Sequence, residues 1–219
     1  MAIREARELP EAADTSPILP VIAVLGGYSS GTTAVAGYLA RLGAYSCPPH
    51  SITNDPRTPD SYESAELRSQ CLKVINEQTL SKAGDDEGFC RWLAPWLGEQ
   101  SRLARREGCT HLLIKHALLA LLAPQIDKVC SPQFVLVTRP LDQIERTRLR
   151  RKWHATFGQA GARVIYSAAF SNLTDMERGY HTVAFGEFLR SATTRRALAS
   201  NLGLDPQAGQ IEAADGWLR

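Results

Sequence analysis

Short apolar runs alternate with longer amphipathic stretches along most of the chain. Residues 20–25, 110–115 and 133–138 are rich in Val, Ile and Leu, and residues 181–185 form a weaker run of the same kind. Such runs are typical of strands that are buried on both faces of a parallel sheet. Strands that alternate with helices predict an α/β fold, with three layers around a central parallel sheet of about four or five strands.

The period of the intervening segments predicts the helices. Apolar side chains recur at helical spacing in residues 32–43, where Gly43 is a typical helix end. Helices or helical turns are also expected over 62–82, 94–107, 117–126, 140–153 and 186–203. Residues 44–60 are rich in Pro, Ser, Thr and Asp and are expected to form a surface loop.

Composition sets broad limits on this picture. A chain of 219 residues fits one domain, here residues 17–219, after an N-terminal tail of residues 1–16 that is expected to be mobile. The acidic side chains of that tail argue against a signal peptide, and the apolar run 18–25 is too short to span a bilayer.

A net charge of +2 provides no global attraction to nucleic acid or membrane. The five cysteines are scattered without a CxxC pair, which predicts no disulfide framework or metal site and a cytoplasmic location.

The segment GGYSSGTT, residues 26–33, has the features of an anion-binding loop between the first strand and the first helix. Gly26 and Gly31 permit backbone conformations that other residues resist. Their spacing before a helix would let successive N–H groups point at one anion, helped by the positive helix end. The alternative is a plain turn in which Ser or Thr caps the helix.

The loop lacks the residues that ATP chemistry requires. Thr32 stands where an ATPase or GTPase has its lysine, and neither 110–115 nor 133–138 ends in Asp. Phosphoryl transfer is therefore disfavoured, although the loop could still hold an anion that needs no metal. In parallel sheets, ligands lie beyond the carboxyl ends of the strands, where this loop, Lys115–His116 and Arg139 are all expected.

The loop sequence SSGTT resembles the donor-binding loop of the PAPS-dependent sulfotransferases, and FVLVTRPLDQIERT resembles their second signature, an Arg followed eight positions later by a hydroxyl residue. The resemblance covers most of residues 20–190 and implies a P-loop NTPase-like sulfotransferase fold, with PAPS as donor, PAP as product and no metal. The residues that it assigns to donor binding are Gly27, Ser29, Ser30, Gly31, Thr32, Thr33, Arg139 and Thr147. For Arg139 the alternative is a surface salt bridge.

The run IKHALLALLAPQ, residues 114–125, is similar to the Lys-x-His-Leu-Pro run of cytosolic family members. This similarity implies that His116 takes the acceptor's proton and that Lys115 meets the transferring sulfate. His116 could instead be a structural histidine, and Lys115 could extend from a strand end into solvent. Glu63 is the alternative base, unless it is a solvated glutamate at a helix start.

One departure from the family bears on activity. The family has Lys or Arg at the position of Ser29, where the cation neutralises charge that develops during transfer. The basic residues that could replace it are Arg57, Lys115, Arg150, Arg151 and Lys152. Otherwise the enzyme would be slow, or the protein would bind a nucleotide or partner without catalysis.

The sequence thus predicts a sulfotransferase that moves a sulfuryl group from PAPS to a hydroxyl or amine of a small-molecule or glycan acceptor. A catalytically impaired nucleotide-binding protein and a P-loop kinase or NTPase are the alternatives. Neither nucleic acid nor a membrane is an expected partner. Most of the basic cluster 146–152 should coat the surface; nucleic-acid binding is the alternative role for this cluster, but no interleaved aromatic residues or known nucleic-acid module support it. A homodimer is compatible with the sequence. The expected loops that would build the acceptor pocket are 44–60, 82–93 and 154–180.

Overall fold

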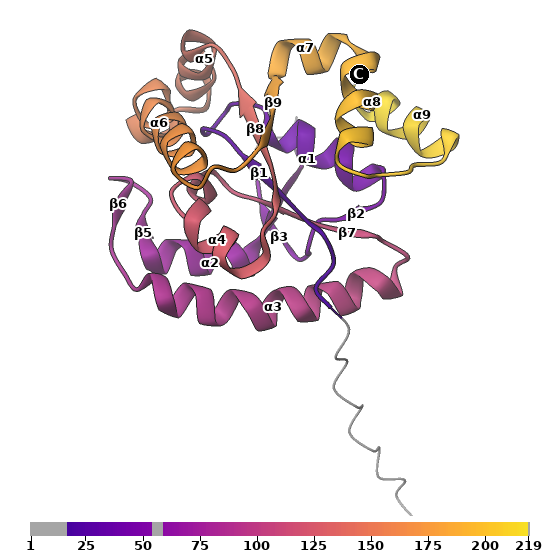
Figure 1. Ribbon diagram of the computed structural model, residues 1–219. Coiled ribbons are helices and arrows are strands. Elements are labelled where there is room, and N and C mark those ends of the chain that lie inside the picture. The colour runs from indigo at the N-terminus through magenta and orange to yellow at the C-terminus, as the bar shows by residue number, and fades with distance from the viewer. Residues whose placement is uncertain (1–16, 54–58, 219) are drawn as a thin grey trace, which may run out of the picture.

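The computed structural model describes residues 17–53 and 59–218 and shows a sheet with helices on both faces (Figure 1). The expected tail, residues 1–16, lies outside the described residues. The central sheet has five strands in the order β2-β7-β1-β8-β9, and every neighbouring pair is parallel. The predicted three-layer α/β fold with a central parallel sheet is confirmed.

The bounds of the elements are as follows. The central strands are β1 Val21–Leu25, β2 Ala44–Tyr45, β7 His111–Lys115, β8 Gln133–Thr138 and β9 Tyr180–Ala184. Two antiparallel pairs lie outside this sheet, β3 His50–Ile52 with β4 Asp60–Ser64, and β5 Ile75–Asn76 with β6 Ser81–Lys82. The helices are α1 Thr32–Arg41, α2 Ala65–Val74, α3 Asp86–Arg106, α4 Ala123–Cys130, α5 Leu141–Arg151, α6 Gln159–Asp175, α7 Phe185–Arg190, α8 Ala192–Asn201 and α9 Ala208–Trp217, with short turns η1 Ala117–Ala120 and η2 Ala155–Phe157.

The two faces of the sheet bury separate hydrophobic cores because side chains alternate along a strand. Val21, Ala23 and Leu25 of β1 pack with α2, α3, α4 and α6 on one face. Ile22 and Val24 pack with α1, α7, α8 and α9 on the other. A fully buried Val, Leu or Ile contributes about 1.5–3 kcal/mol, so both helix layers are held firmly against β1.

Two segments that were expected to be loops contain regular structure. Within 44–60, β2 adds an edge strand to the sheet by pairing with β7, and β3 with the start of β4 forms a hairpin. Within 154–180, α6 buries Ile165 and Leu173 against the sheet. The sequence pattern does not reveal these elements. Strand β2 has two residues, which is too short to show a period, and Ala, Gly and Ser interrupt the apolar pattern of α6.

The other errors concern element boundaries. The expected loop 82–93 is mostly the start of α3, which Asp85 caps by accepting hydrogen bonds from the N–H groups of Glu87 and Gly88. The helical pattern 62–82 divides into the end of β4, helix α2 and the β5–β6 hairpin. The closing helix 186–203 breaks at Ser191, whose hydroxyl caps α8, and α9 follows it without having been predicted.

The strand order creates a switch point beside β1. The chain leaves β1 for β2 on one side and later crosses from β7 over β1 to β8 on the other. Because all of these strands are parallel, β1, β7 and β8 end at one edge of the sheet, where ligands of open α/β folds bind. The glycine loop, Lys115 and Arg139 therefore come together there, as the sequence predicts.

Candidate anion-binding site

The backbone of the glycine loop has the conformation that its glycines suggest. Gly31 has a φ angle of 101°, and Ser29 also lies in the left-handed region with a φ angle of 63°. A Cβ atom on Gly31 would lie 2.2 Å from the ring of Phe185, so only glycine fits this position. Gly31 is the N-cap of α1, and no described side chain caps the helix, contrary to the plain-turn alternative. Ala34 donates its N–H to the carbonyl of Gly31, so the N–H groups of Thr32 and Thr33, the first two of α1, remain available to an anion.

Two cations reach this loop from the strands on either side of β1. Lys115 ends β7, and its Nζ atom donates a 3.0 Å hydrogen bond to the hydroxyl of Thr33. Arg139 follows β8, and its Nη1 atom donates a 3.0 Å hydrogen bond to the carbonyl of Ser29. Among the proposed replacements for the missing loop cation, Lys115 is placed at the loop, whereas Arg57 lies outside the described residues.

Lys115 is buried rather than extended into solvent. Its side chain is 4% exposed, and its ammonium donates to the carboxylate of Glu63 at 2.7 Å and to the carbonyl of Ser61 at 3.0 Å. Glu63 lies in β4 and is not a solvated residue at a helix start. Burial alone would raise the pKa of the Glu63 carboxyl, but the charge of Lys115 and the hydrogen bond from its ammonium outweigh burial and hold the pKa below its ordinary value. Glu63 is therefore a carboxylate at neutral pH.

His116 is also buried, with 1% of its surface exposed. Its Nδ1 atom accepts a 3.2 Å hydrogen bond from the N–H of Leu118, so the neutral ring carries its hydrogen on Nε2. The Nε2 atom lies 3.9 Å from a Glu63 oxygen and has no hydrogen-bond partner among the described residues. Burial lowers the pKa of His116. In this arrangement the free lone pairs for accepting a proton belong to Glu63.

Arg139 is held in place by contacts around the loop. Its backbone N–H donates to the Tyr166 hydroxyl at 3.2 Å, and its guanidinium lies 5.1 Å from the centre of the Phe185 ring. It forms no ion pair with a described carboxylate, which argues against the salt-bridge alternative. Phe185 and Tyr166 were missed in the sequence, because only tertiary packing brings α7 and α6 to the loop.

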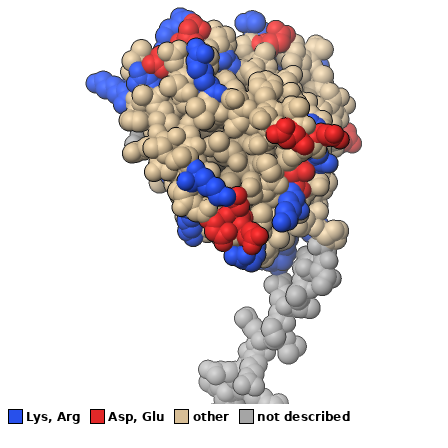
Figure 2. Space-filling model, turned by 60° about the vertical axis from the view of Figure 1, so that its left-hand side comes forward, with Lys and Arg blue, Asp and Glu red and all other residues tan. Residues whose placement is uncertain are grey.

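Thr147 and the basic cluster around it have local partners. The Thr147 hydroxyl donates to the carbonyl of Gln143 at 3.0 Å, within α5. Arg146 pairs with Asp142, and Arg148 pairs with Glu145 at 2.6 Å. Figure 2 likewise shows Lys and Arg next to Asp and Glu around a broad uncharged area on one face of the molecule. The face seen there therefore offers no continuous basic surface of the kind that nucleic acid requires.

The buried His116 makes stability pH-dependent. The unfolded chain takes up a proton near the ordinary pKa of 6.5, whereas the folded chain takes it up only at lower pH. Stability is therefore expected to fall as pH drops below about 6.5, by up to about 1.4 kcal/mol per pH unit. His116→Gln should reduce this slope in urea unfolding between pH 6.5 and 5, and exposed His154→Gln should not. An unchanged slope in His116→Gln would contradict the buried neutral imidazole. His111, whose pKa burial also lowers, accounts for the slope that remains.

No protein-family model matches the chain, and no curated protein sequence matches it significantly. Solved structures do match. Sulfotransferase STF1 from Mycobacterium tuberculosis aligns over 91% of this chain and 71% of its own, with a TM-score of 0.61 and 14% identity. The sulfotransferase domain of a Synechococcus olefin synthase aligns over 93% and 80%, with a TM-score of 0.52 and 15% identity. Sulfotransferase STF9 from Mycobacterium avium aligns over 93% and 68%, with a TM-score of 0.52 and 13% identity.

These likenesses concern the fold, and the chain has a bacterial sulfotransferase-like α/β fold. Within the described residues, no helix combines the length and apolar character needed to cross a membrane. The same part of the chain contains no group of three His, Cys, Asp or Glu side chains arranged to hold a metal ion.

Proposed function

We propose that this protein is a sulfotransferase that uses PAPS as donor and a hydroxyl or amine of a small molecule or glycan as acceptor. One observation carries the proposal. The strands on both sides of β1 end in cations, Lys115 and Arg139, and both cations contact the glycine loop. The sulfotransferase-like fold supports the same function.

The residues at this edge of the sheet fit a bisphosphorylated, sulfated donor. The uncapped N-terminus of α1 offers N–H groups, and the Ser29 hydroxyl has no partner among the described residues. Gly27, Ser29, Ser30, Gly31, Thr32 and Thr33 would hold the 5′-phosphosulfate. Arg139 would bind the 3′-phosphate through its planar guanidinium, with the hydroxyl of Thr147 as a second ligand.

In the proposed reaction, PAPS supplies the sulfuryl group. Glu63 takes the proton of the acceptor as the acceptor oxygen or nitrogen bonds to sulfur and the bond from sulfur to the phosphate oxygen breaks. Lys115 stabilises negative charge on the transferring group and on the leaving phosphate, in the role that the missing cation at position 29 would have. His116, whose Nε2 atom lies 3.9 Å from a Glu63 oxygen, faces the same carboxylate, and its role as the base stays a prediction.

The kinase or NTPase alternative finds no support in this geometry. Magnesium-dependent phosphoryl transfer requires an acidic residue at the end of a strand beside the loop strand. In this chain those strands end in Lys115 and lead into Arg139. Positive charge at both places favours an anion that is bound without a metal.

Binding of PAP, the spent donor, tests the donor site. Calorimetry should detect PAP binding to the purified protein. Arg139→Gln should weaken it by roughly 10- to 100-fold, because charge-assisted hydrogen bonds contribute about 1.5–3 kcal/mol. Arg91→Gln removes an exposed guanidinium from α3 and serves as the control. If the wild-type protein does not bind PAP at high micromolar concentration, the proposed function is wrong.

Ser29 favours one second candidate, a nucleotide-binding protein with impaired catalysis. Radiolabelled PAPS and a panel of hydroxyl and amine acceptors separate the two candidates. Transfer of label above the rate without protein supports the sulfotransferase. Tight PAP binding with no transfer to any acceptor supports the impaired protein.

A further inference from the structure

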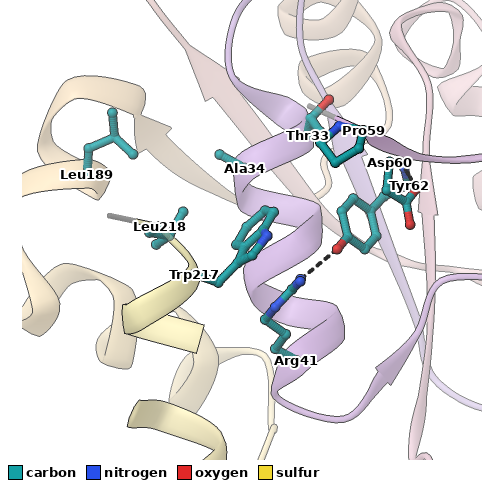
Figure 3. Close-up of a pocket in the computed structure, with 9 residues that line it drawn as sticks. All are labelled: Thr33, Ala34, Arg41, Pro59, Asp60, Tyr62, Leu189, Trp217 and Leu218. Carbon is teal, nitrogen blue, oxygen red and sulfur yellow. Dashed lines mark hydrogen bonds between the residues drawn. The ribbon is translucent and has the colours of Figure 1, made fainter. Parts of the chain in front are cut away.

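An open pocket of about 340 Å³ lies along one side of α1, between the β4 segment and the C-terminal helix α9 (Figure 3). Its volume lies in the lower range of small-molecule sites. Thr33, at the start of α1, lines one end, and Arg41, at the end of the same helix, lines the other. Trp217 lies between these ends with 38% of its surface exposed.

The aromatic wall of this pocket depends on a glycine. A Cβ atom on Gly37 would lie 2.3 Å from the Trp217 ring and 2.7 Å from the Tyr62 ring. Both rings can therefore approach α1 only because residue 37 has no side chain. They meet edge to face, with their ring centres 5.9 Å apart. Residues from β4 and α9, which are far apart in the sequence, thus form one surface against α1.

Arg41 supplies positive charge at the end of the pocket. Its Nη1 atom donates to the Tyr62 hydroxyl at 2.6 Å and to the carbonyl of Gly37 at 2.9 Å. The guanidinium stacks on Trp217, with its central carbon 4.0 Å from the ring centre. It forms no ion pair with a described carboxylate, and Asp60, the acid that lines the pocket, pairs with His50 at 2.8 Å. The Nε and Nη2 donors of Arg41 are left for an anion.

The opposite end of the pocket adjoins the reaction site. Thr33 lines the pocket and also accepts the hydrogen bond from Lys115, which pairs with Glu63. The eight steps from Thr33 to Arg41 span about 12 Å of helix. The guanidinium folds back toward Gly37, whose backbone lies about 6 Å along the helix from Thr33. An anion on Arg41 would therefore lie between about 6 and 12 Å from Thr33 along the helix.

We infer that this pocket binds the acceptor, and that the acceptor carries a carboxylate which pairs with Arg41 while its ring lies along α1 toward Thr33. The inference rests on the proposed sulfotransferase function. A planar carboxylate matches the free donors of a guanidinium better than a neutral hydroxyl does. The separation of the two ends suits a hydroxylated ring acid, such as a uronic acid glycoside, whose nucleophile faces Lys115 and Glu63.

The test compares two probes that differ only in the group expected on Arg41. Calorimetry measures the binding of 4-nitrophenyl β-D-glucuronide and 4-nitrophenyl β-D-glucoside to the protein, with and without saturating PAP. The glucuronide should bind about tenfold more tightly, since its carboxylate gains a charge-assisted hydrogen bond. Arg41→Gln should abolish this preference, Arg41→Lys should keep part of it, and the exposed control Arg91→Gln should keep all of it. Gly37→Ala should weaken both probes by displacing Trp217.

Several results would overturn this inference alone. They are equal affinity for the two probes, no glucuronide binding at millimolar concentration, or a preference that persists in Arg41→Gln. Displacement of the glucuronide by PAP would also overturn it, because the pocket would then belong to the donor's base. Failure of the protein to bind PAP is a separate result, and it would contradict the proposed function itself.

Discussion

Lys115→Met is expected to slow the proposed sulfuryl transfer strongly and to lower the free energy of unfolding by about 3–5 kcal/mol. The substitution keeps the length of the side chain and removes its charge. The Glu63 carboxylate, whose side chain is 18% exposed, would then lose the ammonium that lies 2.7 Å away. A buried charge without its partner destabilises the folded state. The transferring group would lose one of the two cations that contact the glycine loop, so turnover should fall by about 10²–10³-fold or more. Urea unfolding and single-turnover transfer measure the two effects.

A double variant separates charge burial from catalysis. Lys115→Met with Glu63→Gln removes both charges and should regain much of the lost stability, because no unpaired carboxylate remains. It should stay inactive, because both the cation and the base are absent. A Lys115→Met protein with wild-type turnover would refute the role given to Lys115. Unchanged stability would show that Glu63 is not buried as described.

Gly31→Ala should destabilise the protein by about 2–4 kcal/mol and strongly weaken PAP binding. Residue 31 has a φ angle of 101°, which alanine resists, and the added Cβ would lie 2.2 Å from the Phe185 ring. Phe185 lies beneath the guanidinium of Arg139, so its displacement also disturbs the proposed 3′-phosphate ligand. Thermal unfolding and PAP calorimetry measure both effects.

The matched control is Gly98→Ala in α3, where a Cβ would meet no atom within 4 Å. Alanine should stabilise that helix by about 0.5–1 kcal/mol. Adding Phe185→Ala to Gly31→Ala should relieve the clash but not the backbone strain, so only part of the stability should return. A Gly31→Ala protein that is as stable as the wild type would contradict the close packing of the loop on Phe185.

The parts of the fold that could be predicted were those with a strong local pattern. β1, β7 and β8 are buried on both faces, so their Val- and Leu-rich runs mark them directly. β2 has two residues and is defined only by its pairing with β7, which no local period reveals. The hairpin of β3 and β4 could not be predicted from the sequence either, because its strands are polar and pair with each other outside the central sheet.

The same contrast holds for the site. Lys115 and Arg139 were found because they end recognisable strands, and the glycines of the loop because their spacing is a motif. The burial of Glu63 and its pairing with Lys115 depend on the hairpin and were not expected. The tautomer of His116 follows from one bond to the N–H of Leu118, which only the three-dimensional arrangement defines. Arg41 and Trp217 meet across 176 residues of chain and carried no sequence signal.

Glu63 stands on a hairpin that lies outside the central sheet, whereas Lys115 and the glycine loop belong to the sheet and its first helix. Under the proposed function, donor binding and acceptor activation would therefore depend on structurally separate segments. A hairpin of different length or polarity would then be expected to change which acceptors the proposed sulfotransferase uses. An exchange that keeps residues 61 and 63 as partners of Lys115 would leave the proposed donor site in place, so the rest of the hairpin is a suitable segment for engineering acceptor selectivity.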